Sequence, residues 1–314
     1  MKECDTVREQ VPTVERFEEE RPRLRAVAYR MLGSVAEAED AVQETWLRLE
    51  RTGADGVENL GGWLTTVVAR VCLNVLRSRE TRREEPLEAR EIHVPDPLIG
   101  PASGVDPEQQ ALLADSVGLA MLVVLETMSP AERVAFVLHD LFAVPFEEIA
   151  PLIDRTPAAT RQLASRARRR VRDGAPAPDP DLTRQREAVD AFFAAAHDGD
   201  FDALVAVLDP DVVLRADAGA GSRFTTVLNG ARTVASRALT FARLIPFARP
   251  ALVNGTAGVV VVANGRPVSV MAFTVTDGRI TTVDILADTD RLRSLDVGGS
   301  GGSGGQMRSA AMRR

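Results

Sequence analysis

The chain has 314 residues, of which 45% are apolar and 26% charged, and its formal net charge is −7. This composition is typical of a globular protein with room for two or three domains. No apolar run reaches the ~18 residues of a membrane span, and the N-terminus lacks the apolar core of a signal peptide, so we expect a cytoplasmic protein without a membrane partner. Cys4 and Cys72 lie in no metal-ligand motif, which predicts neither a disulfide framework nor a metal site.

Helical patterning begins at Val14 and predicts an all-α unit over residues 14–85. Ser34 and Glu37 have the spacing of a capping box at a helix start. The helix that follows is apolar on one side, and its outer side carries polar residues every three or four positions: Glu37, Asp40, Glu44 and Arg48. The next helix carries a basic edge at spacings of four and three: Arg70, Asn74 and Arg77.

Two proline-rich segments divide the chain. Residues 86–109 are punctuated by prolines and lie in a stretch with seven acidic residues and one arginine, so they predict an extended acidic linker. The alternative is a solvated connector without a role. Residues 174–184 contain the second break, which predicts a flexible hinge.

Between these segments, residues 110–173 predict a second all-α unit that ends in a helix-turn-helix. The stretch from Arg155 to Arg172 holds seven arginines and no acidic residue. Thr156 can cap this helix and Pro157 suits its first position. A helix, a tight turn and a capped basic helix indicate major-groove DNA binding, and a solvated arginine face is the alternative. We expect His139 to be structural, because no catalytic partner stands near it in the sequence.

After the second break, residues 185–296 predict an α+β domain. Two helices come first, followed by strands with hairpin turns at Asn264–Gly265 and Asp277–Gly278. We therefore expect a multidomain protein with two all-α domains and then a cone built on a curved antiparallel sheet. Residues 297–314 begin with a Gly/Ser repeat, and they are either a synthetic linker with a basic peptide or a native disordered tail.

Three stretches of the sequence resemble a known family. VAYRMLGSVAEAEDAVQETWLRL and WLTTVVARVCLNVLRSR resemble region 2 of the extracytoplasmic-function (group 4) sigma factors. MSPAERVAFVLHDLFAVPFEEIAPLIDRTPAATRQLASRARRRVR resembles their region 4. The third unit resembles the SnoaL-like extension of one sigma subgroup, so the resemblance covers about residues 14–296.

The resemblance implies binding roles. RNA polymerase core would be bound through its β′ clamp helices and β flap, and the region 2 residues that match the clamp-helix site are Asp40, Gln43, Glu44 and Leu47. The −10 promoter element would be read by Arg70, Asn74 and Arg77. The −35 element would be contacted by Ala158, Arg161, Gln162 and Ser165 in the groove, with phosphates held by Arg166 and Arg169. Trp63 is either a base-stacking residue or part of the core.

For the extension, the resemblance implies a regulatory role without catalytic residues or a cofactor. The extension would dock on regions 2 and 4 in place of a separate anti-sigma factor. The subgroup's Asn-Pro-Asp-Lys-Leu motif corresponds to Ala287–Leu292 of this chain, which includes Asp288. Only Asp290 and Leu292 match the motif, and Arg291 stands in the place of the lysine.

Two other functions remain open from the residues alone. One is a ligand-responsive helix-turn-helix regulator that works without polymerase core, which would have no use for the acidic helix of the first unit. The other is a SnoaL-type cyclase or isomerase, for which the candidate acid and base groups are His197, Asp217 and Asp284.

Overall fold

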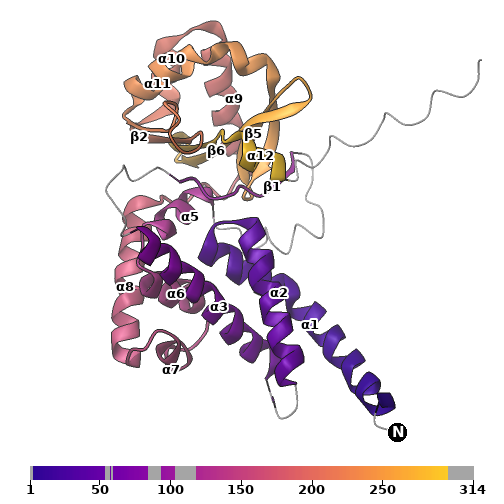
Figure 1. The fold of residues 1–314 in the computed structure, drawn as a ribbon. Helices are drawn as coiled ribbons and strands as arrows, with labels where there is room; N and C mark the ends of the chain where they lie inside the picture. The colour runs from indigo at the N-terminus through magenta and orange to yellow at the C-terminus, as the bar shows by residue number, and fades with distance from the viewer. Residues whose placement is uncertain (1–2, 54–56, 58, 84–92, 103–117, 296–314) are drawn as a thin grey trace, which may run out of the picture.

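The computed structural model describes residues 3–53, 57, 59–83, 93–102 and 118–295. The remaining parts of the expected linker and tail, and the start of the second helical unit, lie outside the described residues. A helical half and a sheet domain lie one above the other (Figure 1). Within the described ranges, no helix combines the length and apolar character needed to cross a membrane.

The first helical unit consists of α1 (Glu3–Leu32), α2 (Val35–Thr52) and α3 (Leu60–Arg83). α1 starts well before Val14, where the apolar pattern begins. Ser34 caps α2, because its Oγ accepts from the Glu37 amide at 3.5 Å. The Glu37 carboxylate does not close the expected capping box and instead pairs with Arg79 of α3, which joins the two helices.

The second helical unit contains α5 (Leu119–Glu126), α6 (Pro130–Phe136), the π-helix η1 (Val137–Leu141), α7 (Phe146–Ile149), the 3-10 helix η2 (Ala150–Leu152) and α8 (Pro157–Gly174). The predicted helix-turn-helix is present: α7 and η2 form its first part, and α8 follows after a short turn. Thr156 caps α8 as expected, with its Oγ1 3.2 Å from the Ala159 amide nitrogen. Asp154, in the turn, has a φ of 55°, which lets the chain reverse within four residues.

The C-terminal domain (residues 182–295) is the expected α+β cone. Its helices are α9 (Leu182–Asp198), α10 (Phe201–Val207), α11 (Ala231–Thr240), the 3-10 helix η3 (Ala242–Phe247) and α12 (Thr289–Ser294). Its strands are β2 (Leu208–Asp217), β3 (Thr226–Asn229), β4 (Ala248–Val253), β5 (Thr256–Ala263), β6 (Arg266–Thr276) and β7 (Arg279–Leu286). Both expected hairpin turns are confirmed, with φ near 51° at Asn264 and 52° at Asp277.

The sheet takes one of its strands from a segment that the sequence predicted to be linker. Its order is β1-β4-β5-β6-β7-β2-β3, and only the β2–β7 pair is parallel. The edge strand β1 (Ile99–Pro101) comes from the expected linker and pairs antiparallel with β4. The linker is therefore not simply a connector, because part of it belongs to the sheet of a domain far along the chain.

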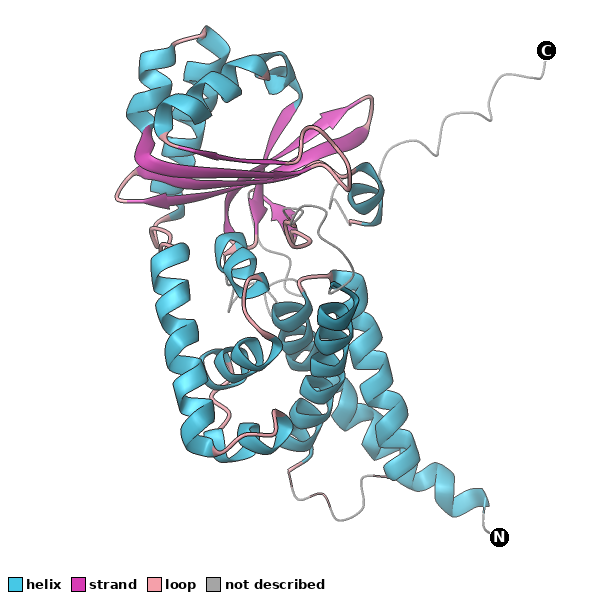
Figure 2. Ribbon diagram, turned by 60° about the vertical axis from the view of Figure 1, so that its left-hand side comes forward, coloured by secondary structure: helices cyan, strands magenta, loops and turns pink. Residues whose placement is uncertain are grey.

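Two apolar cores use opposite faces of this sheet. The inner face packs against α9, α10 and α11, with Phe273 and Val283 fully buried in the cone. The outer face contributes Val260, Val270 and Leu286 to a core that continues through the linker into both helical units. Figure 2 shows the sheet between its own helices and the helical half. The C-terminal domain is thus docked on the helical units.

The expected hinge, residues 174–184, is tied to the C-terminal domain. Asp179 accepts hydrogen bonds from the Asp277 and Gly278 amides, at 3.2 and 3.1 Å, at the β6–β7 turn. Thr276 donates to the Ala177 carbonyl at 2.9 Å. The prediction of a flexible hinge missed these bonds, because the turn lies about a hundred residues further along the chain.

Candidate nucleic-acid interface

The predicted polymerase-binding residues share the outer face of α2. Asp40 and Gln43 are exposed, and Leu47 is 47% exposed although it is a large apolar residue. Glu44 accepts from Arg48 Nε at 2.8 Å and lies 3.6 Å from Arg51. The face therefore presents carboxylates around one exposed leucine, while the opposite side of α2 packs in the core.

The predicted −10 residues lie on α3. Arg70 and Asn74 are exposed, and Arg77 donates from Nη2 to Asp154 Oδ2 of the helix-turn-helix at 3.4 Å. Trp63 is half-buried and packs against the apolar core of the first unit. This favours the core interpretation of Trp63 over base stacking.

All six predicted −35 residues are exposed on one face of α8: Ala158, Arg161, Gln162, Ser165, Arg166 and Arg169. The opposite face buries Thr160, Ala164 and Ala167 against the second helical unit. This arrangement follows from the helical period, since positions separated by three, four, seven and eight residues recur on one side.

The arginines of α8 divide into two groups, and this division was not predicted from the sequence. Arg168 Nε lies 2.5 Å from Asp140, and Arg170 Nη1 lies 3.2 Å from Glu132, so these two brace α8 on the preceding helices. Arg166 and Arg169 point outward and form no ion pair within the described part of the chain. Arg161 stacks over the Phe146 ring at 5.2 Å.

His139 has a structural place, as expected. Its ring stacks on Phe146 with 3.7 Å between centroids, and its Nδ1 lies 3.0 Å from the Val144 carbonyl oxygen. These contacts close the turn between η1 and α7.

Sequence reasoning missed a polar junction between the linker and the C-terminal domain. Arg291 of α12 lies at its centre: Nη2 is 2.6 Å from both Asp96 Oδ1 and the Val94 carbonyl, and Nη1 is 2.9 Å from Asp217 Oδ2. Arg291 is one of the motif residues predicted from the family. Its partners lie 74 to 197 residues away, so no local pattern could have named them.

The other motif residues support this placement of Arg291. Asp288 caps α12 by accepting from the Asp290 and Arg291 amides at 2.9 and 3.2 Å. Leu292 is 1% exposed and packs in the core shared with the helical units. Asp290 is exposed and pairs with Arg293 at 2.8 Å.

The junction also includes the first helical unit. The Tyr29 hydroxyl donates to the Asp96 carbonyl at 2.6 Å and receives a bond from Asn254 Nδ2 at 3.0 Å. Burial raises the pKa of Tyr29 well above its usual range, so it remains a neutral donor. Asp96 Oδ2 accepts from the Val35 amide at 3.1 Å, at the start of α2.

The three candidate catalytic groups do not converge. His197 is exposed at the end of α9. Asp284 pairs with Arg215 at 2.6 Å on the sheet face that docks on the helical units. Burial raises the pKa of the Asp284 carboxyl, and Arg215 opposes the rise. Asp217 lies in the linker junction, where it accepts from the Val94 amide at 3.0 Å.

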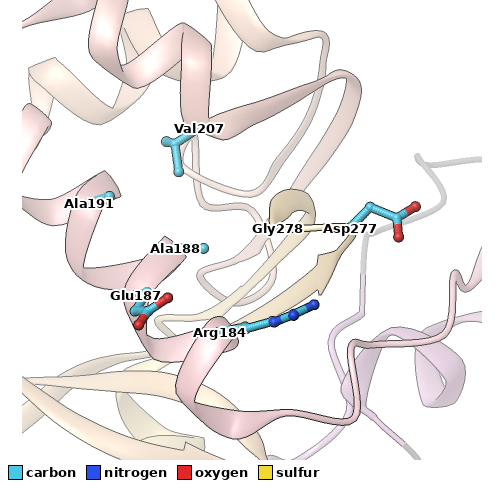
Figure 3. Close-up of a pocket in the computed structure, with 7 residues that line it drawn as sticks. All are labelled: Arg184, Glu187, Ala188, Ala191, Val207, Asp277 and Gly278. Carbon is cyan, nitrogen blue, oxygen red and sulfur yellow. The ribbon is translucent and has the colours of Figure 1, made fainter.

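A hollow of about 460 Å³ lies elsewhere on the C-terminal domain, between α9, the end of α10 and the β6–β7 turn (Figure 3). Its floor is apolar, formed by Ala188, Ala191 and Val207, and charged side chains stand at its rim. None of the three candidate catalytic groups lines it.

The chain is similar to known sigma factors in sequence and in structure. The sigma-70 region 2 model matches residues 16–82, and the sigma-70 region 4 model matches residues 119–171. The chain is 36% identical over 278 residues to the probable ECF RNA polymerase sigma factor SigI of Mycobacterium tuberculosis, covering 87% of this chain and 93% of that protein. It is 38% identical over 294 residues to the ECF RNA polymerase sigma factor SigJ of the same organism, covering 88% and 92%. The crystal structure of SigJ superimposes with a TM-score of 0.73 at 35% identity, covering 90% of this chain and 99% of that one. The chain therefore belongs to the extracytoplasmic-function RNA polymerase sigma factors.

Proposed function

We propose that this chain brings RNA polymerase core to specific promoters through three separate surfaces and that its C-terminal domain controls their spacing. The acidic face of α2 binds core polymerase at the β′ clamp helices, and the second helical unit binds the β flap. α3 contacts the −10 element and α8 contacts the −35 element. The observation that carries the proposal is the presence of these exposed, oppositely charged helix faces in one chain whose relatives are sigma factors.

The charge of each surface suits its proposed partner. Asp40 and Glu44 give α2 a negative field that can steer a basic partner, and exposed Leu47 offers an apolar anchor within it. On α8, Arg161 stands within the first two turns, where a guanidinium can reach a guanine edge in the major groove. Arg166 and Arg169 follow on the same face and suit phosphate contacts.

The structure has a closed arrangement, which we define by the contact between Arg77 of α3 and Asp154 in the turn before α8. The positions that name the −10 and −35 elements differ by about 25 base pairs, which is about 85 Å of duplex at 3.4 Å per base pair. α3 and α8 meet near this contact and have 24 and 18 residues. At about 1.5 Å per residue they reach at most about 65 Å together, so they cannot span that separation. Promoter binding therefore requires the two helical units to part.

The C-terminal domain is placed to oppose that separation. It holds the linker through Arg291 and Asn254, and the linker in turn contacts Tyr29 of the first unit. Its outer sheet face shares one apolar core with both helical units. The domain thus stabilises the closed arrangement in the free chain.

The proposal is tested by a pull-down with purified core polymerase, followed by run-off transcription from a cognate promoter. The full chain is expected to bind core and to start transcription at one promoter, and removal of residues 182–314 is expected to change the transcript yield. If the chain binds promoter DNA but not core at low salt, it is a helix-turn-helix regulator and the proposal is wrong.

A further inference from the structure

The linker segment (residues 93–101) lies extended between the C-terminal sheet and the first helical unit. Val94 is fully buried, and Pro95, Pro97 and Ile99 are buried as well. The segment ends in β1, which pairs Ile99 with Val253 of β4. Addition of a strand to a sheet edge is a common way for a domain to bind an extended peptide.

Two charged groups of the C-terminal domain hold the start of the segment. Asp217 Oδ2 accepts from the Val94 amide at 3.0 Å, and Arg291 Nη2 donates to the Val94 carbonyl at 2.6 Å. The Arg291 guanidinium also donates to Asp96 Oδ1, from Nη2 at 2.6 Å and from Nε at 3.0 Å. A guanidinium fork facing this position selects an acidic side chain.

Asn254 binds the main chain of Leu98 through two hydrogen bonds, one accepted and one donated. Its side-chain Oδ1 accepts from the Leu98 amide at 3.0 Å, and its backbone N–H donates to the Leu98 carbonyl at 2.8 Å. Asn254 is 2% exposed and has a φ of 49° in the turn between β4 and β5. Its polar atoms are thus fixed in a buried position where, without the segment, they would lose these partners.

The proline pattern of the segment matches this site. The three non-proline residues from 94 to 98 donate their amides to Asp217, Gly33 and Asn254, at 3.0, 2.8 and 3.0 Å. Pro95 and Pro97 stand between them and have no amide hydrogen to satisfy. Their rings also restrict the backbone to extended conformations, which lowers the entropy lost on binding.

We propose that this face of the C-terminal domain is a recognition site for an extended acidic peptide with the pattern aliphatic-Pro-Asp-Pro-Leu, and that it accepts such a peptide from another protein as well as from its own linker. The linker is tethered, so its high effective concentration excludes a competing peptide until it is displaced. A partner protein that presents the pattern takes the place of the linker. The site requires neither polymerase nor promoter, so it can be tested apart from the proposed function.

The test uses a fluorescent peptide with the sequence of residues 93–102 and the full chain carrying Asp96→Lys, which repels its own linker from Arg291. By fluorescence anisotropy, the peptide is expected to bind this variant at least tenfold more tightly than it binds the wild type. A matched peptide with lysine at position 96 is expected to bind neither protein. Full chain carrying Arg291→Glu is expected to reverse the preference and bind the lysine peptide.

Equal binding of both peptides to the Asp96→Lys variant, or no binding while its circular dichroism remains native, would overturn the proposal. If that variant does not fold, the wild type serves instead. Millimolar wild-type peptide is expected to speed hydrogen exchange at the Val94 and Leu98 amides, and the lysine peptide is not. Unchanged exchange with both peptides would also overturn the proposal.

Discussion

Arg77, on the outer face of α3, donates to Asp154, in the turn before α8, across 3.4 Å. The two side chains are 47% and 77% exposed, so the pair contributes at most about 1 kcal/mol to stability. The apolar core shared by both helical units holds α3 and the helix-turn-helix together more strongly. The ion pair therefore marks the closed arrangement without being its main cause.

Arg77 is expected to matter for promoter recognition and little for stability. Arg77→Ala should change the free energy of unfolding by less than about 1 kcal/mol in a urea titration, because the pair is exposed. The same variant should lower transcription from a cognate promoter. Asp154→Asn removes the charge of the partner and tolerates the positive φ, so it is the control that should leave promoter use intact. If both variants lose transcription equally, the Arg77–Asp154 contact itself is needed and the proposed role of Arg77 in DNA binding is wrong.

Two arginines of α8 are expected to differ in how they bind DNA. Arg161→Ala should cost about 1–3 kcal/mol at one base pair and relax the preference there, since Arg161 lies in the groove-facing turns. Arg169→Ala should weaken binding to all sequences alike and reduce the salt dependence. Binding assays on a set of single-base promoter variants at two salt concentrations measure both effects. Arg168→Ala, which loses the Asp140 contact, should instead lower thermal stability.

The exposed leucine of α2 is expected to be an anchor for core polymerase. Leu47→Asp should weaken core binding by about 1–3 kcal/mol, because it removes an apolar contact and adds a charge to be buried in the complex. Val14→Asp is the matched control, since Val14 of α1 is 41% exposed and lies outside the proposed surface. Surface plasmon resonance with immobilised core gives both affinities. If the two substitutions weaken core binding equally, α2 is not part of the surface that binds core polymerase.

Arg291 is expected to stabilise the docked C-terminal domain. Arg291→Ala leaves Asp96 and Asp217, which are 13% and 7% exposed, without their cation, and should cost about 2–4 kcal/mol. Arg293→Ala, two residues further along α12, removes an exposed pair and should cost less than about 1 kcal/mol. Urea unfolding compares the two variants. Equal midpoints would mean that the junction contributes little to docking.

His93 is expected to make docking sensitive to acid. The His93 ring is 41% exposed, and its nitrogens lie 3.5 Å from Asp217 and 3.7 Å from Glu126. Partial burial and then Arg291 lower the pKa of His93 below its ordinary value of 6.5, against the opposing effect of Asp217 and Asp96. As the pH falls below 6.5, His93 becomes protonated in the unfolded chain before it does in the folded chain. The contribution of His93 to the free energy of unfolding is therefore complete above pH 6.5 and is lost as the pH falls below it. The urea midpoint should fall more between pH 7.5 and pH 5.5 in the wild type than in His93→Gln. Parallel falls in both proteins would exclude His93 as the source.

The sequence predicted the features that local chemistry determines. Helix starts at Ser34 and Thr156 follow from capping, and hairpins at Asn264 and Asp277 follow from residues that tolerate positive φ. The exposed faces of α2, α3 and α8 follow from the helical period. The hairpin between β4 and β5 was missed, although Asn254–Gly255 carries the same turn signal, because it interrupts one long apolar run.

The linker junction could not be predicted, because it depends on tertiary contacts. Asp96 resembles any other acidic residue of a proline-rich connector, and only folding brings it to Arg291, 195 residues away. Likewise, Arg168 and Arg166 look alike in the sequence, and the difference between them comes from Asp140 on a separate element. Asp217 and Asp284 were candidate catalytic groups for the same reason, since the docking of their sheet face is invisible in the sequence.

The most direct test of the account is the distance between α3 and the start of α8 in the free chain and in the complex with polymerase and promoter DNA. Dyes at Thr81→Cys, one turn after Arg77, and Arg155→Cys, next to Asp154, both exposed positions, would report it by single-molecule energy transfer. Cys4→Ser removes one native thiol, and Cys72 is fully buried with a thiol pKa raised by that burial, so it reacts slowly. The account predicts a short distance in the free chain and a clear lengthening when core polymerase and promoter DNA are both bound. A promoter-bound complex that keeps the short distance would contradict it.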